Sequence, residues 1–260
     1  MLLARTDFGV PKHRGLTYLA IAMKQPGVLV RPLRQMNFHQ SFNEVFFTDA
    51  RVPGDNVIGE VGGGWTAALT TLAYERRFGA MSKPSYDPGP GRARDEARAE
   101  AAAHFETYKW YPQRAGRADL VVEHARRAHV SDDPAVRQEI AALLALRDAS
   151  RWTAERARAE RAGGLRPGAE GSIGKLAASE IARRSAYLHA RIAAAAGLLT
   201  GPDAPFDGTI AEILLSVPAQ SIAGGTDEIQ RNILAEKMLR LPREPAPDRH
   251  LPFNQTRRSD

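Results

Sequence analysis

Short apolar runs separated by turn residues occupy about the first 57 residues of the chain. Residues 16–22, LTYLAIA, and 28–33, VLVRPL, are separated by a Pro-Gly pair, a turn signal whose second residue needs a positive φ. These two runs are therefore predicted to form a β-hairpin. Residues 41–53, SFNEVFFTDARVP, alternate apolar and polar side chains before a proline, which predicts a further antiparallel strand.

Helical spacing replaces this pattern after the glycine-rich residues 59–65. To about residue 240, apolar residues recur three and four positions apart, interrupted by turn-rich breaks. The pattern predicts an α+β fold that is mainly α. Its three predicted parts are a partial antiparallel β-domain at 1–58, a helical bundle domain at 59–243, and an extended or disordered tail at 244–260.

The predicted sheet is incomplete. Residues 1–7, MLLARTD, read as a strand that starts without a preceding turn or cap. Three or four strands in so short a segment leave an unpaired edge, which folded proteins normally cover or blunt. We therefore interpret the segment as part of a larger sheet.

The charge balance makes nucleic acid a candidate partner, because the net charge is +6 and the pI is near 9.8. In residues 151–162, RWTAERARAERA, however, the arginines alternate with Glu155 and Glu160. Such alternation is typical of a solvated helix face with ion pairs one turn apart. We therefore expect no nucleic-acid partner.

The chain has no cysteine, which excludes disulfide bonds and thiolate metal sites. Its start is too polar for a signal peptide, since Arg5 and Asp7 follow only a short apolar stretch. No later apolar run reaches the length needed to span a membrane. We expect a cytoplasmic protein that does not insert into a membrane.

Residues 221–232, SIAGGTDEIQRN, are the first candidate binding site. Two glycines and a threonine lead into an acidic helical turn, an arrangement that offers backbone N–H donors to an anion or a carbonyl oxygen. Thr226 is predicted to be the N-cap of the following helix. Asp227 and Glu228 suit the positive end of that helix.

A Glu-Arg pair lies on the first predicted helix. The apolar stripe of this helix consists of Trp65, Leu69, Leu72 and Ala73. On a helical wheel Arg76 falls within the stripe and Glu75 on its flank. An arginine there either pairs with an anion in a site or extends its guanidinium past the stripe to solvent. The residues alone leave both interpretations open.

Three other sets of residues are weaker candidates for a binding or catalytic site. Residues 59–65, GEVGGGW, lack the lysine of a Walker motif and are interpreted as a hinge into the bundle. Ser172, Lys175 and Ser179 are predicted to be capping and solvent-facing positions. No metal is expected, because four histidines of the predicted helical part are scattered and lack metal-site spacing. These histidines are His104, His124, His129 and His189.

Three segments together resemble the acyl-CoA dehydrogenase family: 42–65, FNEVFFTDARVPGDNVIGEVGGGW, 74–79, YERRFG, and 221–245, SIAGGTDEIQRNILAEKMLRLPREP. The resemblance implies an amino-terminal helical domain, a middle β-domain and a carboxy-terminal four-helix bundle, with FAD between the β-domain and the bundles. This chain matches from the middle of the β-domain onward. It departs from the family pattern at residues 88–118, where many members are shorter.

The resemblance also assigns the catalytic base. In many members this base is a glutamate just before the Gly-Thr of the last segment, where this chain has Gly224. In a branch similar to isovaleryl and long-chain dehydrogenases, the base comes instead from a Glu-Arg pair on the first bundle helix. This chain combines Glu75 and Arg76 with Gly224, so the resemblance implies Glu75 as the base.

The remaining roles follow from the same resemblance. The backbone N–H of Gly224 resembles the backbone donor that family members direct at the thioester carbonyl, with a flavin ribityl hydroxyl as the second donor. Arg76 and Gly225 are assigned to the acyl-CoA substrate, and Thr226 and Glu228 to FAD.

The implied activity is FAD-dependent α,β-dehydrogenation of an acyl-CoA to a trans-2-enoyl-CoA, in fatty-acid or related acyl catabolism. An electron-transfer flavoprotein is the implied electron acceptor, and a homo- or hetero-tetramer the implied assembly. One alternative is a non-catalytic structural subunit of a hetero-oligomeric enzyme. Another is a truncated fragment whose start is an internal methionine of a longer reading frame.

Overall fold

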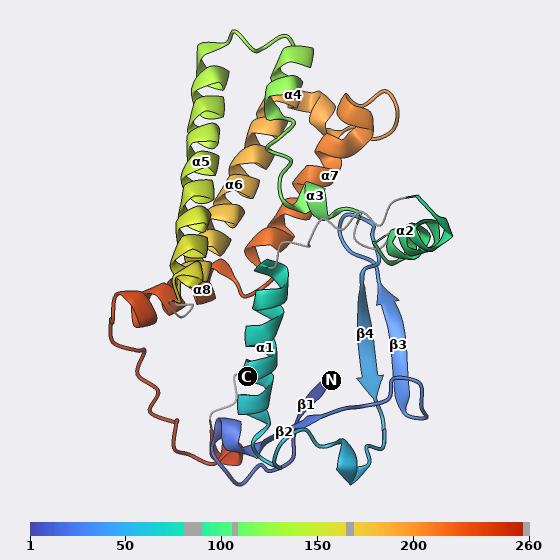
Figure 1. Ribbon diagram of the computed structural model, residues 1–260, viewed down its shortest axis with the longest axis vertical. Coiled ribbons are helices and arrows are strands. Elements are labelled where there is room, and N and C mark those ends of the chain that lie inside the picture. The colour runs from blue at the N-terminus through green and yellow to red at the C-terminus, as the bar shows by residue number, and fades with distance from the viewer. Residues whose placement is uncertain (81–89, 106–108, 165–168, 257–260) are drawn as a thin grey trace. The chain divides into compact units, whose positions relative to one another are not determined.

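The computed structural model describes residues 1–80, 90–105, 109–164 and 169–256 (Figure 1). The strands are β1 (Leu2–Arg5), β2 (Leu16–Leu19), β3 (Val28–Leu33) and β4 (Phe42–Phe47). The α-helices are α1 (Gly64–Ala80), α2 (Arg92–Phe105), α3 (Tyr111–Arg114), α4 (Val121–Arg127), α5 (Pro134–Ala162), α6 (Glu170–Ala193), α7 (Thr209–Ser216) and α8 (Asp227–Ile233). Short 3-10 helices lie at Lys12–Gly15, Gly54–Asn56, Ala194–Leu198, Pro205–Gly208, Val217–Ser221 and Phe253–Gln255, and a π-helical turn at Leu234–Met238. The predicted mainly helical fold with small antiparallel sheets is confirmed.

The strands pair differently from the prediction. Strand β1 pairs antiparallel with β2, and β3 pairs with β4, which runs in the opposite direction (Figure 1). The predicted hairpin between residues 16–22 and 28–33 is therefore wrong. Gly27 does have a positive φ of +82°, but its carbonyl oxygen accepts a hydrogen bond of 2.8 Å from the Thr48 N–H. The turn thus directs β3 onto the following strand, and β2 takes its partner from the start of the chain.

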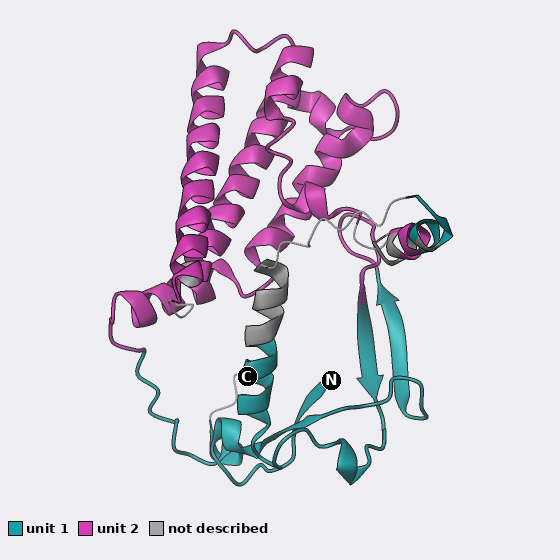
Figure 2. Ribbon diagram, viewed as in Figure 1, with its two compact units in different colours: residues 1–33, 43–96, 244–260 teal, residues 34–42, 97–243 magenta. Residues whose placement is uncertain are grey.

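The described residues form two compact units (Figure 2). Unit 1 comprises residues 1–33, 43–96 and 244–260, and unit 2 comprises residues 34–42 and 97–243. The domain boundaries predicted from the sequence at residues 58 and 243 stay a prediction.

In unit 1, helix α1 begins directly on strand β2. A Cβ atom at Gly64 would lie 2.4 Å from the Tyr18 nitrogen and 2.7 Å from the Leu16 carbonyl oxygen. Such distances are well inside van der Waals contact, so only glycine permits this approach. The glycine-rich residues 59–65 therefore act as a close-packed junction at the start of the helix.

The carboxy-terminal segment of unit 1 lies against the first strand and the turn after it. The Phe253 N–H donates to the Val10 carbonyl oxygen over 3.0 Å, and the Arg5 guanidinium lies 3.6 Å from the centre of the Phe253 ring. Lys12 and Asp248 form an ion pair of 2.8 Å. These contacts fix the two ends of the described chain within one unit.

Helix α6 is the central helix of unit 2 and packs against α4, α5, α7 and α8. One apolar cluster joins α6 to α4 and α5 through Val121, Ala125, Val136, Leu143, Leu188 and Ile192. A second cluster joins α6 to α7 and the turn that follows it through Ala182, Ala186, Ile210, Ile213 and Val217. Each fully buried valine, leucine or isoleucine side chain contributes about 2 kcal/mol of hydrophobic stabilisation.

The arginine-rich end of α5 is a solvated face, as predicted. Arg151 contacts Glu155 at 3.4 Å and Arg156 contacts Glu160 at 3.9 Å, each one helical turn apart. All four side chains are exposed, so these pairs contribute little to stability.

Two histidines meet in the core of unit 2. The Nδ1 atoms of His124 on α4 and His189 on α6 lie 2.9 Å apart, and His189 Nε2 lies 3.1 Å from the Arg117 carbonyl oxygen. Because that oxygen only accepts, His189 carries its proton on Nε2 and accepts at Nδ1 the proton of His124. Burial, reinforced by the neighbouring His189, lowers the pKa of His124 to about 4. Burial lowers the pKa of His189 as well, so both rings are neutral at pH 7.

The close approach at Gly64 yields a stability comparison between two glycines. Gly64→Ala is expected to destabilise the chain by about 2 kcal/mol or more, because the added methyl overlaps β2 backbone. Gly174→Ala is the matched control: it lies within α6, and its Cβ would meet no atom within 4 Å. Alanine there is expected to stabilise by about 0.5–1 kcal/mol through helix propensity. Urea unfolding measures both, and equal effects of the two substitutions would contradict the packing at Gly64.

The histidine pair makes stability depend on pH. The folded-state pKa of His124, about 4, lies below its ordinary value of 6.5, so only the unfolded chain binds a proton between those values. The free energy of unfolding is therefore expected to fall by roughly 1 kcal/mol per unit as the pH drops through this window. His124→Gln should remove this contribution, whereas His250→Gln, at an exposed histidine, should retain it. Parallel curves for wild type and His124→Gln in urea titrations from pH 7 to 4 would contradict the assignment.

Candidate active site

The Gly-Gly-Thr segment forms a turn between the 3-10 helix Val217–Ser221 and α8. Gly224 and Gly225 have φ values of +70° and +91°, in the left-handed region where a side chain is strained. Thr226 returns to extended backbone, and its Oγ1 accepts a hydrogen bond of 3.3 Å from the Ile229 N–H. The predicted N-cap is confirmed, and the two glycines are needed for the turn that precedes it.

Two backbone N–H donors of the turn have no hydrogen-bond partner among the described residues. Among the described residues, no hydrogen bond engages the N–H groups of Gly224 and Gly225, whereas the Gly224 carbonyl oxygen accepts one of 2.9 Å from Gln230 Nε2. A Cβ atom at Gly224 would meet nothing within 4 Å, so this side of the turn is open. Open N–H groups beside free space can bind a carbonyl oxygen or an anion.

Asp227 fixes the end of the turn to α6. Its side chain is only 4% exposed, and its carboxylate accepts hydrogen bonds of 2.6 Å each from Lys175 Nζ and Arg183 Nη1. Burial by itself raises the pKa of Asp227, but the hydrogen bonds from Lys175 and Arg183 outweigh it and hold the pKa well below its ordinary value. The carboxylate therefore stays charged at neutral pH and keeps both cations bound.

The prediction that Ser172, Lys175 and Ser179 are capping and solvent-facing positions is wrong. Ser172 and Ser179 are buried, and Ser179 Oγ donates to the Gln220 carbonyl oxygen over 3.1 Å. The Lys175 side chain is 15% exposed and bound to Asp227. Lys175, Ser179 and Arg183 follow one another at four-residue spacing, so they form a polar stripe on one face of α6. That stripe on a largely apolar helix was the signal that the sequence contained for this network.

Glu228 lies next to the network but points to solvent. Its side chain is 77% exposed and lies 3.5 Å from Arg231. Its own backbone N–H and the Thr226 hydroxyl hydrogen-bond to the carboxylate and lower its pKa. A charged, accessible carboxylate therefore stands beside the open turn.

The sequence-predicted residues fall into two groups. Unit 2 holds the Gly-Gly-Thr turn together with Glu228, all within five positions of one another. Glu75 and Arg76 lie in α1, as predicted, but their side chains lie outside the described residues.

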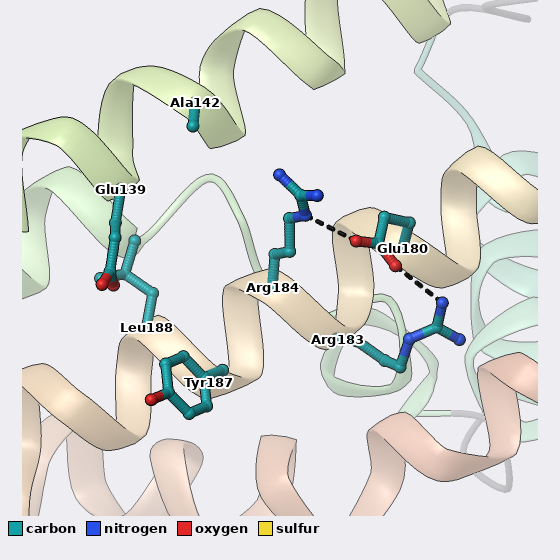
Figure 3. A pocket seen from close by; sticks show the side chains of 7 residues that line it. All are labelled: Glu139, Ala142, Glu180, Arg183, Arg184, Tyr187 and Leu188. Carbon is teal, nitrogen blue, oxygen red and sulfur yellow. Dashed lines mark hydrogen bonds and ion pairs between the residues drawn. The ribbon is translucent and has the colours of Figure 1, made fainter.

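A surface pocket of about 360 Å³ lies between α5 and α6, and Figure 3 shows its lining. Arg183 and Arg184 both donate to Glu180 there, over 2.7 and 2.6 Å. Among the described residues that line the pocket, none belongs to the Gly-Gly-Thr turn. Its arginines are already paired with a carboxylate, so the pocket is a weaker candidate for an anionic ligand than the open turn.

In the described ranges, no group of three or more histidine or carboxylate side chains is placed to hold a metal ion. No helix in the same part of the chain is both long enough and apolar enough to cross a bilayer.

The open turn fits the polar groups of a flavin cofactor. The N–H groups of Gly224 and Gly225 can donate to carbonyl oxygens, and the Thr226 hydroxyl and the exposed Glu228 carboxylate can bind hydroxyl groups. A Cβ atom at Gly224 would enter the free space on this side, which a bound group can occupy instead.

Comparison with known proteins identifies relatives of this chain. A family model described as the acyl-CoA dehydrogenase carboxy-terminal domain matches residues 115–239. Acyl-CoA dehydrogenase IpdE1 of Mycobacterium tuberculosis is 34% identical over 247 residues, which cover 94% of this chain and 55% of that protein. The chain thus spans about half the length of this curated relative.

Solved structures share the fold. The structure titled Tcur3481-Tcur3483 steroid ACAD matches with a TM-score of 0.70 and 24% identity, over 94% of this chain and 56% of that one. An acyl-CoA dehydrogenase from Geobacillus kaustophilus matches with a TM-score of 0.66 and 24% identity, over 92% and 56%. The sequence comparisons agree on one family: the chain belongs to the acyl-CoA dehydrogenase family, and its residues 115–239 match the carboxy-terminal domain of that family.

Proposed function

We propose that this chain takes part in the α,β-dehydrogenation of an acyl-CoA thioester to a trans-2-enoyl-CoA, with Glu75 as the catalytic base. One observation carries the proposal: a Glu-Arg pair, Glu75 and Arg76, occurs on α1 in a chain that has Gly224 before its Gly-Thr. This combination resembles the family branch in which the base lies on the first bundle helix. The open turn at Gly224 supports the proposal, because it offers a backbone donor.

The reaction begins with a weakly acidic C–H bond. The Glu75 carboxylate takes the proton from the carbon α to the thioester, and negative charge develops on the thioester oxygen. The Gly224 N–H donates to that oxygen and stabilises the charge as it forms. Arg76 and Gly225 bind and orient the acyl-CoA.

FAD is the proposed cofactor, and Thr226 and Glu228 are the residues of the turn proposed to contact it. When bound, FAD supplies the acceptor for the hydride that leaves the β-carbon. An electron-transfer flavoprotein is the proposed partner that then receives the electrons.

The acyl group is a separate proposal. One structure with the same fold carries the word steroid in its title. Steroid-derived acyl-CoA thioesters therefore belong in the panel of test substrates beside straight-chain and branched ones.

A second candidate function is that of a non-catalytic subunit of a hetero-oligomeric dehydrogenase. It is favoured because a structure of similar fold has a title that joins two names, Tcur3481 and Tcur3483. In that case a partner chain supplies the remaining cofactor contacts.

Replacement of the proposed base tests the first candidate. Glu75→Gln keeps the size of the side chain but cannot accept the proton, so kcat is expected to fall by about 10²–10⁴-fold while flavin content stays unchanged. Glu100→Gln, at an exposed position of α2, is the control and should keep wild-type kcat. Unchanged turnover in Glu75→Gln would contradict the assignment of Glu75 as the catalytic base.

Flavin content separates the two candidates. The chain purified alone is expected to show the visible absorbance of FAD at a ratio of about 1:1, if its own turn and neighbouring residues suffice for the cofactor. A colourless protein that gains flavin only with a partner chain would favour the second candidate.

A further inference from the structure

Gln230 lies on α8 behind the Gly-Gly turn, and the proposed chemistry gives it no role. Its side chain is buried, with 7% exposed, and its Nε2 lies 2.9 Å from the Gly224 carbonyl oxygen and 3.5 Å from that of Gly225. Carbonyl oxygens only accept hydrogen bonds, so the amide must present its NH₂ group to the turn. One side chain therefore holds the turn at two successive carbonyl groups, the second more weakly.

Holding a carbonyl group also sets the direction of an N–H group. The described residues contain no cis peptide bond, and in a trans peptide the C=O of one residue and the N–H of the next point in opposite directions. The Gly224 carbonyl points to Gln230, so the Gly225 N–H points away from it. Among the described residues that N–H has no hydrogen-bond partner.

The turn needs such an anchor because of its glycines. Gly224 and Gly225 lack a Cβ atom, so the peptide between them can rotate at little steric cost. Gln230 also packs closely on the turn, since a Cβ atom at Gly225 would lie 2.8 Å from Nε2. Gln230 thus fills the space beside Gly225, whereas a Cβ atom at Gly224 would meet no atom within 4 Å.

We infer that Gln230 is a positioning residue: it fixes the Gly224–Gly225 peptide so that the Gly225 N–H donates to the thioester oxygen of the acyl-CoA. The inference rests on the proposed function and adds a second backbone donor to that of Gly224. A donor aimed in advance at the developing charge acts more strongly on the transition state than on the bound substrate.

Kinetics of Gln230→Met test this role. Methionine has a similar length but no N–H donor, so kcat is expected to fall roughly 10–100-fold with KM changed by less than about threefold. Gln138→Met, at an exposed position of α5, is the matched control and should behave as wild type. An active wild type with an unchanged kcat in Gln230→Met would overturn the inference alone. A wild type that turns over no acyl-CoA would overturn the proposed function instead.

Gln230→Glu adds a variant whose hydrogen bonding depends on pH. Its ionised carboxylate cannot donate, whereas its protonated form can, and burial raises the pKa of such a carboxyl. Relative to wild type, kcat of Gln230→Glu is expected to rise as the pH falls. A pH profile parallel to that of wild type would overturn the inference.

A readout without turnover uses the chain labelled with ¹⁵N-glycine. On titration with octanoyl-CoA, the amide resonance of Gly225 is expected to shift in wild type and to shift less in Gln230→Met. Equal shifts in both proteins would overturn the role of Gln230.

Discussion

The buried carboxylate of Asp227 is the contact on which the candidate site depends. It binds Lys175 and Arg183 at the same time, and both cations come from α6. Its position at the start of α8 means that these bonds fix the residue immediately after Thr226. Replacing Asp227 would deprive the largely buried Lys175 ammonium of its partner, and breaking a buried ion pair in this way costs about 3–5 kcal/mol. The turn therefore has a rigid end, although its glycines are conformationally free.

Helix α6 packs against α4, α5, α7 and α8 through faces that differ in chemistry. One face carries the polar stripe of Lys175, Ser179 and Arg183, and other faces contribute to two apolar clusters. His189 lies on the same helix, but its buried polar atoms are hydrogen-bonded without any charge, unlike those of the ion pairs. Its ring and that of His124 stay neutral and share a hydrogen bond, which avoids the cost of a buried charge.

In the proposed reaction, backbone N–H groups bind the thioester oxygen, and a side-chain carboxylate takes the proton. The turn has positive φ values, at which a side chain on Gly224 would be strained, and among the described residues its N–H groups have no hydrogen-bond partner. A carboxylate base at that position would meet the same strain, so glycine at 224 agrees with a base on another element. Behind the turn, Gln230 donates a hydrogen bond to the Gly224 carbonyl oxygen, and Asp227 accepts one from Arg183.

Local interactions were readable from the sequence, and contacts between distant residues were not. The helical periodicity, the Thr226 cap, the ion pairs one turn apart on α5 and the family motifs all depend on residues close together in the chain. The pairing of β1 with β2, the burial of Lys175 against Asp227 and the meeting of His124 with His189 were decided only by the tertiary structure. Lys175 and Asp227 are 52 positions apart, and no periodicity encodes which of many charged side chains a buried carboxylate will meet. The sequence by itself thus determined the helices, the strands and the family, while the packing around α6 decided which polar side chains support the turn.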